Sequence, residues 1–508
     1  MREREAKLGA GPAFALPDLD GVIDGVTATA LPQRHLDAVY YDTPDLRLAR
    51  RGITVRHRTG EDDGWTVKLP DDGGRGPTLV RNELTFPGAR VAGPAGPGGH
   101  KQGPPKPVAD LVRAHVRTST LGSVARLRTR RTPVELRDEQ GRRVAEVVDD
   151  EVSVFDGRRV AARFREVEVE LTEDAPAGLL ERVVQRLASA GAGQPERTPK
   201  LVRALGWQAT RPPEPSPVEL HDDATVSAVV RETLVAAITH MLRHDPGVRL
   251  GDDPEDVHQA RVATRRLRSD LRTFRSVLDP EWLSATSGEL KWLGTVLGAV
   301  RDADVLLERL HRQASELSDR DARATAALLR RLTVQRDEAR LALLAALRSE
   351  RYVVLLDRLI AASEAVPVTE GDDKPALDAL PELVRRPWNH LKKAVDALDA
   401  DPADDALHQV RIRAKRARYA AEAAAALIGK PARAFAKAVA DLQTVLGDHQ
   451  DAVVAEEWLR REGGRSRAAA LVAGQLIARQ QLEAAASRER WPSMWKRASA
   501  KKLRAWFT

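Results

Sequence analysis

The spacing of apolar residues changes near residue 206, and this change constrains the fold more than any other feature of the chain. Before it, short segments such as 52–58 and 164–171 alternate apolar and polar residues, which is typical of half-buried strands. After about residue 224, apolar residues recur with the spacing of amphipathic helices. The sequence therefore predicts an α+β protein with two domains of different class.

A proline-rich stretch, RPPEPSPVE at 211–219, separates the two patterns, and such a composition favours a stiff, extended spacer. A chain of 508 residues also exceeds what one hydrophobic core usually supports. We predict a β domain over 1–206, a linker over 207–220 and a helical domain over 221–508.

The helical half repeats itself. Segments 256–271 and 290–305 both return in similar form about 150 residues later. A shared offset favours duplication of a helical bundle over chance. We expect internal repeats at about 224–365 and 374–508.

Composition excludes several classes of site. The chain has no cysteine, so disulfides, thiolate nucleophiles and Cys-ligated metals are absent. It shows neither an apolar leader nor a run long enough to span a membrane, which predicts a cytoplasmic location without membrane contact. The net charge is only +7, but its basic residues are clustered, which favours an anionic partner.

Charged residues share faces of the predicted strands. Glu3, Glu5 and Lys7 alternate at the start of the chain, as Arg56 and Arg58 do later. On one strand this indicates a solvated face, but its recurrence favours a barrel whose charged side lines the lumen. Buried charges need partners, so acids and bases would meet each other or a ligand there. Carboxylates without His or Cys favour Mg²⁺ or Mn²⁺ beside a polyanion.

The first half resembles the CYTH domain, the triphosphate tunnel metalloenzyme fold, over roughly residues 1–206. The resemblance rests on an ordered series of motifs: EREAK, YYDTPDLRLARRGITVRHR, WTVKLP, RNEL, AEVVDDEVSV, REVEVEL and PKLVRAL. It implies an eight-stranded antiparallel tunnel with flanking helices, in which glutamates hold a divalent metal and basic residues bind triphosphate.

Carried over motif by motif, the resemblance implies three sets of tunnel residues. The metal ligands would be Glu3, Glu5, Glu168 and Glu170. The triphosphate contacts would be Lys7, Arg56, Arg58, Lys68, Arg128, Arg131, Lys200 and Arg203. The catalytic residues would be Lys7, Glu83 and Asp150, with one of the two acids orienting a water or another ligand. The strand phase of the arginines at 126–131 stays open, as does the choice between Asp149 and Asp150.

Two predicted helices carry rows of cations at alternating spacings of three and four residues, which place them on one side of a helix. The basic residues of the first helix are His258, Arg261, Arg265, Arg266, Arg268 and Arg272. Those of the second are His408, Arg411, Lys415, Arg416 and Arg418. A solvated basic face is the plain alternative, but repetition in both copies favours a linear polyanion. The rows carry little aromatic surface apart from Tyr419, which disfavours nucleic acid.

This half resembles the CHAD domain, a duplicated helical module whose basic residues are associated with polyphosphate. We therefore expect metal-dependent hydrolysis of inorganic triphosphate or short polyphosphate in the tunnel, with polyphosphate captured by the helices and an association with polyphosphate granules. The rival from another class is a non-catalytic polyphosphate-binding or targeting protein. Thiamine triphosphatase and adenylate cyclase activities are weaker alternatives.

Overall fold

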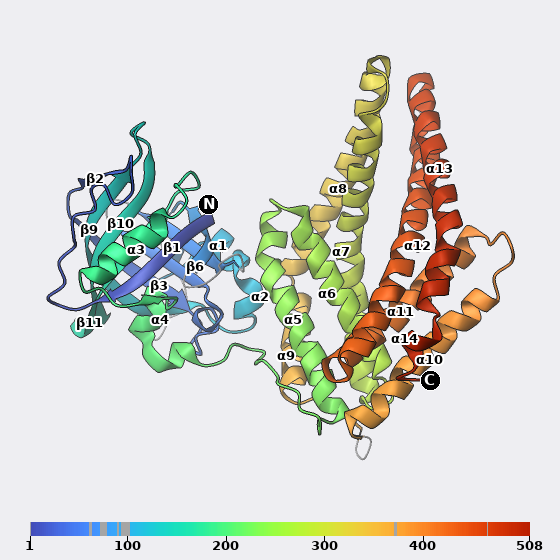
Figure 1. The fold of residues 1–508 in the computed structure, drawn as a ribbon, viewed down its shortest axis with the longest axis horizontal. Coiled ribbons are helices and arrows are strands. Elements are labelled where there is room, and N and C mark those ends of the chain that lie inside the picture. The colour runs from blue at the N-terminus through green and yellow to red at the C-terminus, as the bar shows by residue number, and fades with distance from the viewer. Residues whose placement is uncertain are drawn as a thin grey trace. The chain divides into compact units, whose positions relative to one another are not determined.

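The structure, a computed structural model, describes residues 2–59, 63–71, 79–88, 91–92, 102–369, 373–464 and 466–508. The chain divides into two compact units, Met1–Glu214 and Pro215–Thr508. The first unit is built on a sheet and the second from helices (Figure 1).

Eight antiparallel strands of the first unit close into a barrel, because β9 pairs with β3 on one side and with β10 on the other. In barrel order the strands are β10 (Arg143–Asp156), β11 (Arg159–Leu171), β1 (Arg2–Ala10), β6 (Leu79–Phe86), β5 (Gly64–Pro70), β4 (Thr54–Thr59), β3 (Arg34–Asp42) and β9 (Gly122–Arg137). The shorter strands are β2 (Thr27–Ala30), which pairs with β9, β12 (Pro195–Glu196), which pairs with β1, and the ribbon of β7 (Val91–Ala92) and β8 (Gln102–Gly103). The predicted eight-stranded antiparallel barrel is confirmed.

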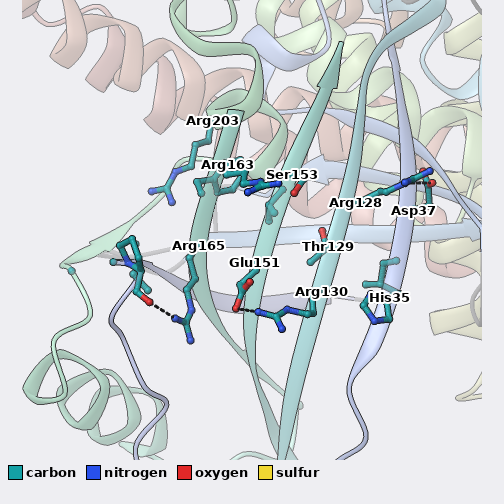
Figure 2. Close-up of a pocket in the computed structure, with 18 of the residues that line it drawn as sticks. His35, Asp37, Arg128, Thr129, Arg130, Glu151, Ser153, Arg163, Arg165 and Arg203 are labelled. Atoms are coloured by element: carbon teal, nitrogen blue, oxygen red, sulfur yellow. Dashed lines mark hydrogen bonds and ion pairs between the residues drawn. The ribbon is translucent and has the colours of Figure 1, made fainter. Parts of the chain in front are cut away.

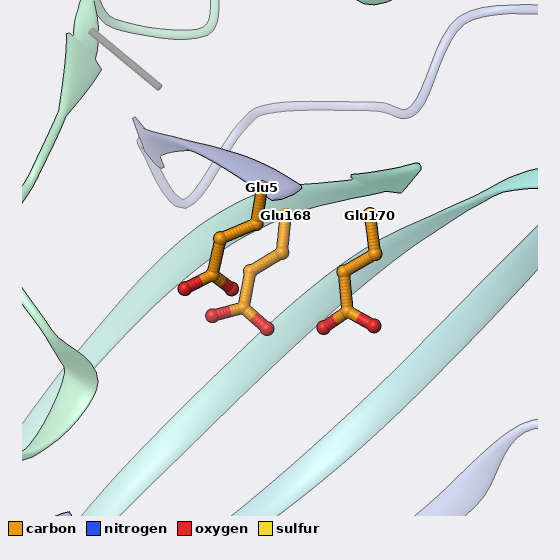
Figure 3. Close-up of side chains that lie close together, drawn as sticks. All are labelled: Glu5, Glu168 and Glu170. Atoms are coloured by element: carbon orange, nitrogen blue, oxygen red, sulfur yellow. The ribbon is translucent and has the colours of Figure 1, made fainter. Parts of the chain in front are cut away.

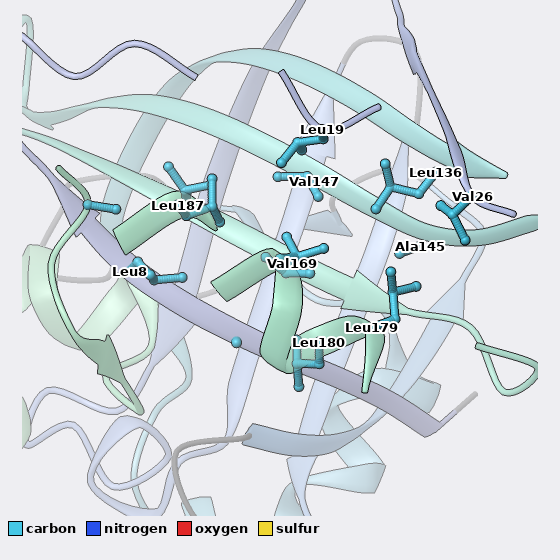
Figure 4. Packing of buried hydrophobic residues seen from close by; sticks show 14 of the residues in the cluster. Leu8, Leu19, Val26, Leu136, Ala145, Val147, Val169, Leu179, Leu180 and Leu187 are labelled. Carbon is cyan, nitrogen blue, oxygen red and sulfur yellow. The ribbon is translucent and has the colours of Figure 1, made fainter. Parts of the chain in front are cut away.

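The apolar side of the barrel faces outward and packs under a helix. Leu8 of β1, Val147 of β10 and Val169 of β11 form one buried cluster with Leu179 and Leu187 of α3 (Leu179–Ser189), as Figure 4 shows. Alternate strand residues point to opposite faces, so the residues next to these three in sequence point into the barrel. The other helical turns of this unit are η1 (Ala49–Arg51), α1 (Lys106–Leu111), α2 (Arg113–Val116), α4 (Lys200–Leu205) and η2 (Gly206–Thr210).

Helix α4 fills part of the barrel interior. Its Leu201 and Val202 pack against Leu127 of β9 and Val152 of β10. This apolar packing anchors α4 at the position that brings Lys200, its first residue, among the charged residues of the lumen.

The second unit consists of two successive sets of helices. The first set is α5 (Val226–Leu250), α6 (Pro254–Thr273), α7 (Pro280–Ala314), η3 (Asp319–Asp321), α8 (Ala322–Arg348) and α9 (Glu350–Glu364). The second is α10 (Ala376–Asp396), α11 (Asp404–Ile428), α12 (Lys430–Gly463), α13 (Arg467–Ala498) and α14 (Lys501–Arg504). Within the described ranges, none of the helices combines the length and apolarity that a membrane crossing requires.

The two sets meet through reciprocal contacts. The Val226 N–H donates to the Lys374 carbonyl at 3.0 Å, and the Ala376 N–H donates to the Ala224 carbonyl at 2.8 Å. These contacts join the starts of α5 and α10, which lie 150 positions apart, and α6 packs on α11. The predicted duplicated helical bundle is confirmed.

Candidate functional site

The barrel lumen holds a cavity of about 300 Å³ with a mostly charged wall. Period-two alternation explains its composition, because strands such as β1 and β11 pack apolar residues outward and turn the charged residues between them inward. Nine of the residues predicted from the sequence line this cavity: Lys7, Arg56, Arg58, Lys68, Glu83, Arg131, Glu168, Glu170 and Lys200.

Three carboxylates converge on one side of the lumen (Figure 3). Glu5, Glu168 and Glu170 each offer an oxygen within 4.8 Å of the others'. Glu5 is 1% exposed, and its Oε2 has no hydrogen-bond partner in the part of the chain that the structure describes. An all-carboxylate set with a buried oxygen that accepts no hydrogen bond fits a hard divalent cation. The predicted ligand Glu3 lies on β1 opposite Arg81, but its side chain falls outside the described residues.

Lys7 lies between two of these acids. Its Nζ is 3.4 Å from Glu5 Oε2 and forms an ion pair with Glu168. Burial alone would lower the pKa of Lys7, but Glu168 and Glu5 more than offset this effect and raise it. Lys7 therefore stays an ammonium ion, so it can stabilise negative charge but cannot accept a proton.

Asp150 organises two further cations. Arg131 donates to its two oxygens at 2.9 and 2.7 Å, and Lys200 donates at 2.6 Å. Burial opposes ionisation of this fully buried acid, but Lys200 and Arg131 outweigh it and lower the pKa. Since its oxygens already accept three charged hydrogen bonds, Asp150 is suited to positioning the cations.

Glu83 is the more accessible of the two acids predicted to orient a water. Lys68 Nζ lies 2.7 Å from its Oε2, and its side chain is 27% exposed. Burial raises the pKa of Glu83, but Lys68 and Arg56 outweigh this and lower it. Glu83 is thus an ionised acceptor in the cavity wall.

The structure decides the strand phases that the sequence left open. Arg131 and Asp150 face the lumen, whereas their sequence neighbours Arg130 and Glu151 pair with each other beside an outer hollow of about 1300 Å³ (Figure 2). Arg128 shares the outer phase and donates to Asp37 at 3.0 Å, and Asp149 pairs with Arg165. Arg128 therefore does not join the predicted triphosphate contacts.

Arg203 lies at the edge of the charged network. It pairs with Glu166 at 3.5 Å and with Glu196 at 2.6 Å, and it lines the outer hollow. Glu166 was not predicted as a site residue although it shares the strand face of Glu168, and its carboxylate lies 3.3 Å from Lys200. Burial raises the pKa of Glu166, and the nearby cations offset only part of this.

Among the described residues, three cations that the sequence prediction missed line the lumen: Arg34, Arg81 and Arg143, of which Arg81 is the most buried. It is 4% exposed, forms an ion pair with Glu5 and lines the cavity. The signal was present, because Arg81 stands two positions before Glu83 and hence on the same strand face.

In the helical unit, Arg261 and Arg265 of α6 gather with Arg411 and Lys415 of α11, and we call these four residues the central basic cluster. All four are partly buried, and Arg261 pairs with Asp302 of α7. Burial lowers the pKa of Lys415 to about 7, helped by Arg411, Arg265 and Arg261. Cations from both repeats therefore lie close together in this cluster and repel one another.

The other predicted basic residues distribute around this cluster. Tyr419 accepts a hydrogen bond from Arg265 at 2.8 Å, and the Arg418 guanidinium lies 5.3 Å from its ring centroid. Arg418 pairs with Glu422 at 2.7 Å, and Arg266 lies 3.8 Å from Asp270. Burial lowers the pKa of His258, assisted by Arg301. His408 has a buried Nδ1 without a hydrogen-bond partner among the described residues, and Arg268 lies near Arg272.

Comparisons with known proteins agree with this architecture. The model of the CYTH domain matches residues 1–201 and that of the CHAD domain matches residues 232–460. Two proteins of Mycobacterium tuberculosis, Uncharacterized protein MT2285 of strain CDC 1551 / Oshkosh and Uncharacterized protein Rv2226 of strain ATCC 25618 / H37Rv, are each 34% identical over 487 residues. Both matches cover 90% of this chain and 88% of the relative.

Two solved structures are also similar. PptA from Streptomyces chartreusis is 28% identical, with a TM-score of 0.45 over 54% of this chain and 100% of its own. The CHAD domain from the plant Ricinus communis is 29% identical, with a TM-score of 0.46 over 57% of this chain and 96% of its own. The domain models and the full-length relatives show that the chain belongs to the family that joins a CYTH triphosphate tunnel domain to a CHAD domain.

Proposed function

We propose that the tunnel is a metal-dependent triphosphatase that hydrolyses inorganic triphosphate or short polyphosphate. The observation that carries this proposal is the convergence of Glu5, Glu168 and Glu170 in a lumen that also holds basic residues. A site for an anion alone has little use for buried acids, because they repel it. Acids and bases together suit a phosphate chain bound with a cation.

The residues divide the work as follows. Arg56, Arg58, Lys68 and Arg131 would bind phosphate oxygens, while Asp150 keeps Arg131 oriented. Mg²⁺ or Mn²⁺ held by the converging carboxylates would polarise a phosphoryl group. The ionised Glu83 would orient the attacking water, and the ammonium of Lys7 would stabilise charge on the departing phosphate. Positioning and charge stabilisation supply most catalysis in such reactions.

The central basic cluster would capture polyphosphate, since four like charges crowded together gain from a linear polyanion. Covalent linkage of this unit to the tunnel would raise the effective concentration of chain ends for hydrolysis. The two units would then act on one class of ligand.

One observation favours the non-catalytic alternative. Glu168 pairs with Lys7, Arg131 and Lys200 at once, so the acid is already compensated in the absence of metal. Such a network could hold phosphate without turnover, and the whole chain would then bind and target polyphosphate.

Metal-dependent turnover distinguishes these functions. The full chain is incubated with tripolyphosphate, thiamine triphosphate, ATP or long-chain polyphosphate, with and without Mg²⁺ or Mn²⁺, and phosphate and cyclic nucleotide are measured. We expect phosphate release from tripolyphosphate that requires metal and falls at least about 100-fold in Glu5→Gln. Glu151→Gln is the matched control, because Glu151 lies on the outer face of β10. If the protein hydrolyses none of these substrates, the result favours the non-catalytic polyphosphate-binding function instead.

Capture by the helices is measured by binding of long-chain polyphosphate to the full chain. We expect the double variant Arg265→Ala, Lys415→Ala to bind at least about tenfold more weakly, because each cation contributes a charge-assisted contact. Lys437→Ala and Arg460→Ala are control variants, since both residues pair with an acid on their own helix. Equal binding by all variants would refute the assignment to the central basic cluster.

A further inference from the structure

A second basic site lies in the helical unit, at a hollow of about 200 Å³ between α6, α10 and α11. We call it the α10 pocket. Five arginines line it: Arg272, Arg275, Arg386, Arg413 and Arg416. His390 lies among them, and the pocket's single acid, Glu382, forms an ion pair with Arg385.

These five arginines have no polar partner among the described residues of the protein. Across the described ranges, no hydrogen bond or ion pair to any of them is present, in contrast to the neutralised arginines of the tunnel. Three of them repel one another, since Arg272 and Arg413 add to the effect of burial in lowering the pKa of Arg416. Unpaired guanidinium groups around one hollow gain most from an anion placed inside it.

The duplication supplies an internal control for this pocket. Because α5 and α6 correspond to α10 and α11 at an offset of 150, each lining residue has a counterpart in the other repeat. The histidine, the acid and one arginine are kept, as His240, Glu232 and Arg266. The other four arginines, Arg272, Arg275, Arg386 and Arg413, correspond to Glu422, Ala425, Ala236 and Ala263.

The counterpart region is acidic and contains a buried carboxylate. Its Asp270 is 2% exposed, lies 3.8 Å from Arg266 and has no hydrogen-bond partner in the described part of the chain. Glu232 and Glu422 lie near enough to raise its pKa beyond the effect of burial. The fold therefore tolerates alanine and glutamate at these positions, so the fold does not require four arginines in the α10 pocket.

We propose that the α10 pocket binds a compact phosphate anion, inorganic phosphate or pyrophosphate, at a site separate from the tunnel and from the central basic cluster. Arginine forks match phosphate oxygens in pairs, and several cations suit an anion with more than one charge. The pocket is open, since Arg272, Arg275, Arg386 and Arg416 are exposed, and its volume of about 200 Å³ suits a small anion. The proposal holds whether or not the tunnel hydrolyses its ligand.

The counterpart repeat also dictates the test. Arg386→Ala and Arg413→Ala together place in the pocket the residues found at the equivalent positions of α5 and α6. Lys393→Ala is the control, an exposed cation on α10 that does not line the pocket. Binding of inorganic phosphate, pyrophosphate and long-chain polyphosphate to the full chain is measured by calorimetry at fixed ionic strength. The central-cluster variant Arg265→Ala, Lys415→Ala and the tunnel variant Arg131→Ala are titrated in parallel.

We expect the double pocket variant to lose one class of site, with an affinity at least about tenfold weaker, while the control and the two other variants keep that site. Unchanged affinity and stoichiometry in the double pocket variant would overturn the proposal. So would a loss seen only with long-chain polyphosphate, because the pocket would then belong to the polyphosphate-binding surface.

Discussion

The tunnel and the central basic cluster both gather cations, but they treat the resulting charge in opposite ways. In the tunnel, Lys7, Arg131 and Lys200 each contact buried carboxylates. In the cluster, Lys415 is surrounded mainly by arginines, and its pKa falls to about 7. The charges of the tunnel are therefore neutralised before any ligand binds. The cluster is only partly neutralised, by Asp302 beside Arg261 and Asp451 near Arg411 and Lys415, and a polyanion would relieve the remaining repulsion. This difference suits the tunnel to selecting and hydrolysing its ligand, and the central basic cluster to capturing a polyanion.

The largest expected effect comes from removing a compensating acid. Asp150→Asn removes the carboxylate nearest to Arg131 and Lys200, whose remaining acids lie 3.3 to 3.6 Å away. Breaking a buried ion pair in this way typically costs about 3–5 kcal/mol of unfolding free energy. Chemical denaturation of the ligand-free chain measures the loss, and tripolyphosphate should restore part of it by pairing the freed cations. A cost below about 1 kcal/mol would show that the tunnel is not compensated in this way.

Removing a cation should change stability with opposite signs in the two regions. Arg131→Gln leaves the buried Asp150 with Lys200 but without its two hydrogen bonds from Arg131, and should destabilise the chain by several kcal/mol. Lys415→Met removes repulsion from three arginines and should stabilise it by up to about 1 kcal/mol at pH 6, where Lys415 is charged. The stability of each variant is measured from its denaturation midpoint. If both substitutions destabilise the chain, the tunnel and the central basic cluster do not differ in this way.

Polyphosphate binding should weaken as the pH rises from 6 to 8. Lys415 has its pKa lowered from 10.5 to about 7, so it is charged below pH 7 and neutral above it. A polyanion favours the charged form, so binding above pH 7 must take up a proton, and the affinity should fall about three- to tenfold. Calorimetry in buffers of different ionisation enthalpy detects this proton uptake. Lys415→Arg should abolish it, and an unchanged uptake would assign the titration to another group.

The smallest effect concerns the acids at the edge of the cluster. Asp302 pairs with Arg261 and its side chain is 66% exposed, so Asp302→Asn should change stability by less than about 1 kcal/mol. Because the pair competes with a bound anion, the same variant should bind polyphosphate about two- to threefold more tightly. Weaker binding would mean that Asp302 orients Arg261 for the ligand, as Asp150 orients Arg131 in the tunnel.

The sequence predicted the lumen well because a strand has a fixed period of two. Alternation predicted that several strands share a charged face in a barrel, and the resemblance to the CYTH domain then named the individual residues of the wall. Alternation failed where a run contained both phases, as at 126–131, because only the pairing of Arg131 with Asp150 across β9 and β10 selects the inward residues. Arg128 was assigned to the lumen without that information.

Helical periodicity was a weaker guide to the basic surfaces. It placed Arg265 and Arg272 on one side of α6, but the structure sends them to different sites because α10 and α11 pack at different points along that helix. No spacing in the sequence indicates which cation meets Tyr419, which meets a carboxylate and which stays unpaired. Those outcomes depend on neighbours supplied by the other repeat.

By itself, the sequence determined the two classes of domain, the duplication and the face of most charged strand residues, because periodicity is a local property of backbone geometry. The tertiary structure alone decided which charges neutralise one another. The pairing of β1 with β11 places Glu5 opposite Glu170 and Lys7 opposite Glu168, and Lys200 lies 3.6 Å from Glu168. The packing of α6 on α11 places Lys415 among arginines. Electrostatic energy depends on distance and burial between residues far apart in the chain, and only the folded chain fixes both.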